Sequence, residues 1–100
     1  MKTTGEIIRR EREKKELLLR QVASQLDMDT AILSKIERGE RKATREQIIK
    51  LAEILGLDKD ELLIQFLSER IAYSLADEDN FKQALKLAEK RVEYIKQNKK

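Results

Sequence analysis

Apolar residues recur along this chain at the spacing of an α-helix. Leu19, Val22, Ala23 and Leu26 follow an i, i+3, i+4, i+7 pattern. This spacing places their side chains on one helix face, because an α-helix has about 3.6 residues per turn. The pattern returns in the stretch "IIKLAEIL" at residues 48–55. It predicts an all-α fold.

Capping residues and glycines predict where the helices begin and end. The side chain of Ser, Thr, Asp or Asn accepts a hydrogen bond from a backbone N–H of the first turn, and Gly readily adopts the left-handed conformation that ends a helix. The predicted starts are Thr3 with Glu6, Asp29, Thr44 with Gln47, and Asp58 with Glu61, and the predicted stops are Gly39 and Gly56. Five helices follow, at about 4–15, 19–26, 30–38, 45–55 and from 59 onwards.

The final third of the chain predicts a helical extension. The fifth helix continues through residue 75, and after a break a last helix carries an apolar stripe whose members are spaced 4, 3, 4 and 3 residues apart. This surplus of apolar face predicts a dimerisation element, the alternative being that the last helix folds back on its own domain. The predicted contacts are Phe66, Leu67, Ile71, Leu75, Phe81, Leu85, Val92 and Ile95, with Ala88 in the same stripe.

Composition excludes several classes of function. The chain has 100 residues, of which 41% are charged and 4% aromatic, and it has no cysteine and no histidine. Without a thiolate, an imidazole or a disulfide, the sequence argues against an enzyme and offers no metal site. The acidic stretch "DEDN" at 77–80 is better explained as a helix start. No cofactor or small-molecule ligand is expected, and no signal peptide or membrane span is found, which predicts a cytoplasmic protein.

Basic residues gather in one short stretch although the net charge is only +3. Five of them, set against Glu37 and Glu40, are Lys35, Arg38, Arg41, Lys42 and Arg45. Such a cluster is either a solvated loop or an electrostatic contact with phosphates. The two short helices at 19–26 and 30–37, joined by three or four residues, have the dimensions of a helix-turn-helix.

Residues 5–63 resemble the Cro and phage-repressor family of DNA-binding domains, the XRE family. The resemblance is carried by "QVASQL", "LSKIERGERKAT" and "IIKLAEILGL", in this order and at this spacing. It implies a five-helix domain over residues 1–63 whose third helix enters the major groove. Residues 64–100 lie outside the resemblance, and their apolar pattern predicts the helical extension. The resemblance also implies an ion pair between Arg12 and Glu37.

The resemblance assigns roles to the basic stretch and to the helix before it. Its base-reading positions are Thr30, Ala31, Ile32, Ser34 and Lys35, and its phosphate contacts are Arg38, Arg41, Lys42 and Arg45. Ala31 and Ile32 offer no hydrogen-bonding group, so they are limited to apolar contact with a thymine methyl; Ile32 alternatively covers the core. The chain departs from the family at Leu18 and Leu19, where a serine cap and a backbone-contacting glutamine are usual.

These observations predict a sequence-specific transcriptional regulator that binds double-stranded DNA as a homodimer on a palindromic operator. A restriction-modification controller or an antitoxin would be narrower versions of this function. The alternative is a protein-interaction module on a helix-turn-helix scaffold, in which Ala31 and Ile32 contact a partner protein.

Overall fold

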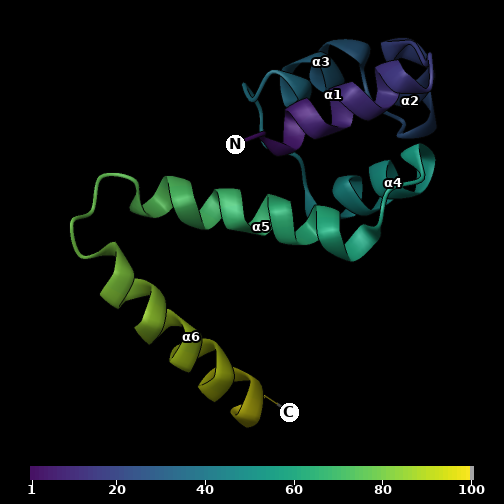
Figure 1. The fold of residues 1–100 in the computed structure, drawn as a ribbon. Coiled ribbons are helices and arrows are strands. Elements are labelled where there is room, and N and C mark those ends of the chain that lie inside the picture. Colours follow the sequence, from purple (N-terminus) through teal and green to yellow (C-terminus); the bar gives the residue numbers. More distant parts are fainter. Residues whose placement is uncertain (100) are drawn as a thin grey trace. The chain divides into compact units, whose positions relative to one another are not determined.

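A computed structural model of the chain describes residues 1–99, and within these residues every regular element is an α-helix (Figure 1). The helices are α1 (Thr4–Lys14), α2 (Leu19–Gln25), α3 (Thr30–Glu37), α4 (Arg45–Leu55), α5 (Lys59–Leu75) and α6 (Phe81–Asn98). The predicted all-α class with a helical C-terminal extension is confirmed. The chain forms two compact units, residues 1–70 and 71–100, and the boundary falls within α5.

The core of the first unit consists of aliphatic side chains and one aromatic, Phe66, and comes from α1 to α5. Its most deeply buried side chains are Ile8, Val22, Leu33, Ile48, Leu51 and Leu55. Helix α1 contacts α3 and α4, and α2 contacts the same two helices. Helix α5 closes the core with Leu62, Leu63 and Phe66, which share one of its faces.

Phe66 was predicted to be a dimer contact, but the structure places it in the core. Its side chain is 7% exposed. The reason is its spacing: Phe66 follows Leu62 by four residues and Leu63 by three, so all three face inward. Leu67 and Ile71 lie on the exposed part of α5.

Each of the first four helices ends with the same hydrogen-bonded turn, the Schellman motif. In α3, the Glu40 N–H donates to the Lys35 carbonyl at 2.8 Å and the Gly39 N–H donates to the Ile36 carbonyl at 3.1 Å. A residue with positive φ is required between these bonds. Gly39 and Gly56 fill this position after α3 and α4, whereas Glu16 (φ 56°) and Asp27 (φ 51°) fill it after α1 and α2.

Helix α1 lies against the end of α3 with almost no space between the two backbones. A Cβ built on Gly5 would lie 2.4 Å from the Ile36 carbonyl oxygen and 2.5 Å from that of Glu37. No side chain fits at this distance. Gly5 is therefore required for the packing of α1 on α3.

A carboxylate from α5 satisfies the N-terminus of α1. Glu69 accepts hydrogen bonds from the Thr4 backbone N–H and, at 3.0 Å, from the Thr4 hydroxyl. The N-terminus of a helix has free N–H groups and partial positive charge, so a carboxylate is favourable there. Gln65 adds a hydrogen bond from its side-chain amide to the Lys2 carbonyl at 3.1 Å.

Candidate nucleic-acid interface

Helices α2 and α3 and the turn between them form a helix-turn-helix. The turn is tight because Asp27 adopts a left-handed conformation and the Met28 N–H donates to the Ala23 carbonyl at 2.9 Å. Asp29 then begins α3, its carboxylate accepting the Ala31 N–H at 3.4 Å. The predicted cap of the third helix is thereby confirmed.

The start of α2 is capped by only one hydrogen bond. The Gln21 side chain accepts the Leu18 N–H at 2.7 Å. The reciprocal bond of a capping box needs a side-chain oxygen at the N-cap position. Leu18 has none, so its departure from the family leaves one backbone N–H of the first turn without a side-chain acceptor.

The residues predicted to read bases occupy the outer side of α3. Thr30, Ala31 and Lys35 are exposed, and Ile32 and Ser34 are half-buried. The opposite side of the helix is held in the core by Leu33 and Ile36. Helix α3 therefore presents two exposed polar side chains, those of Thr30 and Lys35, with small or apolar residues between them.

A buried ion pair fixes the end of α3 to α1. Arg12 donates from Nε to Glu37 Oε2 at 2.7 Å and from Nη2 to Glu37 Oε1 at 3.0 Å. A third bond runs from Arg12 Nη1 to the Leu17 carbonyl at 2.8 Å. The hydrogen bond to Glu37 and the attraction of its carboxylate raise the pKa of Arg12, while burial lowers it less. The guanidinium therefore stays charged throughout the working pH range.

The residues predicted to contact phosphates are all exposed. Arg38, at the end of α3, forms an ion pair with Glu40 at 3.1 Å between Nε and Oε2. Both side chains of this pair are more than half exposed, so the pair is weak and can open for another anion. Arg41 and Lys42 lie in the segment after Gly39, and Arg45 begins α4. The four cations thus lie along the chain from the C-terminal end of α3 to the start of α4.

A concavity of about 230 Å³ lies where α1, α2 and α3 meet, beside the basic residues. Arg9, Arg12 and Arg38 line it together with Glu37, Ser34 and Leu19. Its lining carries three positive charges and one negative charge. Arg9 could not be predicted from the sequence, because it lies in the mixed-charge stretch "RRERE" at 9–13, which is typical of a solvated helix face. Only the packing of α1 on α3 brings it beside Arg38.

A helix-turn-helix whose second helix is exposed on one side and bordered by arginines and lysines is typical of the DNA-binding domains of transcriptional regulators. The comparisons with known proteins identify the family. The model of the Cro/C1-type, XRE-like helix-turn-helix family matches residues 8–62, and the chain belongs to this family. No curated protein and no solved structure matches the chain.

This family consists of DNA-binding regulatory domains, so membership supports DNA as the partner of the chain and transcriptional regulation as its class of function. None of the helices in residues 1–99 is both long enough and apolar enough to cross a membrane.

Proposed function

We propose that this protein is a sequence-specific transcriptional regulator that binds a palindromic operator as a homodimer. The observation that carries the proposal is the outer side of α3, where Thr30, Ala31 and Lys35 are exposed next to four exposed basic residues. A helix of eight residues is short enough to lie in the major groove and reach base edges with its first turns. A controller of a restriction-modification locus or an antitoxin would be a specific form of this function.

The two groups of residues have different roles in the proposal. Lys35 donates to guanine O6 and N7, whereas Arg41, Lys42 and Arg45 neutralise phosphates. The concavity between Arg9 and Arg38 receives a further phosphate, which replaces the exposed carboxylates of Glu13 and Glu40 as the partner of these two arginines. It takes over the backbone contact that the family's glutamine usually makes and that Leu19 does not provide.

The homodimer rests on apolar side chains that remain exposed. Leu67 and Ile71 of α5 are 42% and 48% exposed, and no residue of α6 is buried. A twofold dimer would present two copies of α3, so the half-sites of the operator would lie one helical turn, about 34 Å, apart, or a small multiple of it. Light scattering over a concentration series tests the dimer directly.

Selection of binding sites from randomised duplexes tests the proposed specificity. Fluorescence anisotropy on the selected duplex and on a scrambled one, across a salt series, then separates the residue roles. Lys35→Ala should weaken binding to the selected duplex by roughly 1–3 kcal/mol and relax the preference at one base pair in each half-site. Arg41→Ala should weaken binding to both duplexes alike and reduce the salt dependence by about one unit of slope for each phosphate that is no longer neutralised.

Lys90→Ala is the control, because it also removes one exposed positive charge but lies in α6, outside the helix-turn-helix. Equal losses for both duplexes with Lys35→Ala would make Lys35 a phosphate contact. A wild-type protein that enriches no sequence would support the second candidate, a protein-interaction module. The exposed Ala31 and half-buried Ile32 at base-reading positions are the observation that favours this candidate.

A further inference from the structure

Helix α6 carries an apolar seam that no part of its own unit covers. The seam consists of Phe81, Leu85, Ala88, Val92 and Ile95, and all five side chains are exposed. Their spacing of 4, 3, 4 and 3 residues is that of the a and d positions of a coiled coil. In this assignment Leu85 and Val92 are a positions, and Phe81, Ala88 and Ile95 are d positions.

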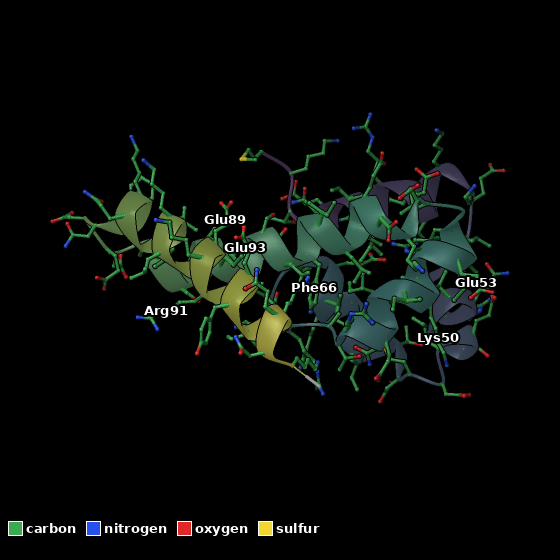
Figure 2. The ribbon with its side chains drawn as sticks, turned by 90° about the horizontal axis from the view of Figure 1, so that it is seen from below. Lys50, Glu53, Phe66, Glu89, Arg91 and Glu93 are labelled. Carbon is green, nitrogen blue, oxygen red and sulfur yellow. The ribbon has the colours of Figure 1, made fainter. Side chains whose placement is uncertain are left out.

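Charged residues flank the seam on both sides. The e positions are Lys82, Glu89 and Lys96, and the g positions are Ala84, Arg91 and Asn98. Figure 2 shows Glu89 and Arg91 on opposite sides of α6. When two copies of a helix pair through their seams, these flanking residues meet across the interface. Their charges therefore discriminate between the possible pairings.

A parallel pairing of two α6 helices is disfavoured by these charges. In a parallel pair the g position of one helix meets the e position of the next heptad in the other helix. Arg91 would then face Lys96 of the second copy, twice in a symmetric dimer, and Ala84 would face Glu89. The pairing has two repulsive contacts and no attractive one.

In an antiparallel pair, e meets e and g meets g. Two registers bring four pairs of a and d positions opposite each other, which is the most that this seam allows. In one register Val92 packs against Ala88 of the second copy. Glu89 then faces Glu89, Arg91 faces Arg91 and Lys82 faces Lys96, so every charged contact is repulsive.

In the other register Phe81 packs against Val92 of the second copy and Leu85 against Ala88. Lys82 then faces Glu89 in both halves of the dimer, and Arg91 faces the neutral Ala84. Each layer also places a larger side chain opposite a smaller one, which fills the space between the helices evenly.

We infer that two copies of this chain associate through an antiparallel pair of α6 helices in which Lys82 of each copy contacts Glu89 of the other. The inference rests on the homodimer of the proposed function and specifies its interface. It is carried by the exposed seam, by the charges beside it and by the matching sizes of the opposed side chains.

Charge reversal tests the contact between Lys82 and Glu89. Glu89→Lys converts two attractive contacts into two repulsive ones, so the dissociation constant of the dimer, measured by sedimentation equilibrium, should rise about tenfold at low salt and less at 1 M salt. The double variant Lys82→Glu with Glu89→Lys should restore wild-type association. Lys90→Glu, on the outer side of α6, is the control and should leave association unchanged.

Disulfide trapping tests the orientation, because the chain has no cysteine of its own. In the inferred pair, position 92 lies beside position 81 of the second copy and about 16 Å along the axis from its own equivalent, at 1.5 Å per residue. A mixture of the full-length Phe81→Cys and Val92→Cys variants should therefore form the mixed disulfide dimer, and Val92→Cys alone should form none.

Efficient self-crosslinking of Val92→Cys would establish a parallel pair and overturn the inference. A dimer in sedimentation that forms no disulfide in any combination would also overturn it, but would leave the homodimer intact. A chain that stays monomeric at all concentrations would overturn the homodimer itself. Binding to the selected duplex is measured separately, so failure of the DNA-binding proposal is recognised independently.

Discussion

Replacing Glu37 by glutamine should destabilise the protein more than any other single change of charge in the helix-turn-helix. The side chains of Arg12 and Glu37 are 10% and 4% exposed, and they share two hydrogen bonds. Glu37→Gln keeps the shape of the side chain but removes its charge and one acceptor oxygen. Arg12 then retains as acceptors the Leu17 carbonyl and the single amide oxygen at position 37, and its charge is left buried without a counterion.

The expected cost is roughly 3–5 kcal/mol, the range for removing one partner from a buried ion pair. A domain of this size is stable by about 5–15 kcal/mol, so roughly a fifth or more of its stability would be lost. Urea denaturation followed by circular dichroism measures the difference in the free energy of unfolding between the two proteins. An equal dependence of this free energy on urea concentration (the m value) shows that both proteins unfold in the same way.

The matched control is Glu13→Gln, which breaks the pair between Arg9 and Glu13. This pair is 3.5 Å long, its side chains are more than half exposed, and its removal should cost less than about 1 kcal/mol. If Glu37→Gln lowers the free energy of unfolding by no more than Glu13→Gln does, burial does not strengthen the Arg12–Glu37 ion pair, and the prediction is wrong. Replacing both Arg12 and Glu37 by apolar residues of similar volume should recover most of the stability, because no charge is then stranded.

Three further predictions concern the same unit. Gly5→Ala should lower the free energy of unfolding by roughly 1–3 kcal/mol, because its Cβ would overlap the Ile36 and Glu37 carbonyl oxygens; a wild-type urea midpoint would contradict the packing of α1 on α3. Glu16→Gly should instead stabilise the protein by about 1 kcal/mol, since it removes a side chain from a left-handed position, and an unchanged thermal midpoint would show that Glu16 carries no strain there. The destabilisation caused by Glu37→Gln should be equal at pH 7 and pH 10. Because the pKa of Arg12 is raised in the folded protein, the ion pair contributes its full stability at every pH below the pKa of an unfolded arginine, and this contribution is lost only as the pH rises through the folded pKa. A destabilisation that is smaller at pH 10 than at pH 7 would contradict a charged, buried Arg12.

The features that could be predicted from the sequence are those decided within a few residues. The starts of α3 and α4 depend on Asp29 and Thr44, whose side chains bond to backbone two or three residues ahead, and the structure confirms both. The ends at Gly39 and Gly56 are local in the same way.

Other features depend on partners far along the chain or on residues with no distinctive signal. The bond from Thr4 to Glu69 spans 65 residues, and nothing near either residue indicates the other. Gly5 was not identified as a packing residue, because its neighbours Ile36 and Glu37 come from α3. Glu16 and Asp27 adopt conformations that usually need glycine, so local composition gives the wrong expectation for their backbone.

The four Schellman turns have a consequence for how the first unit folds. Each turn is closed by hydrogen bonds between residues at most five positions apart, and the next helix starts within a few residues of it. The chain therefore brings α1, α2, α3 and α4 together through short loops, whose closure costs little entropy. Helical domains dominated by such local contacts fold in microseconds to milliseconds. We therefore expect the helix-turn-helix of a newly synthesised chain to form on this timescale.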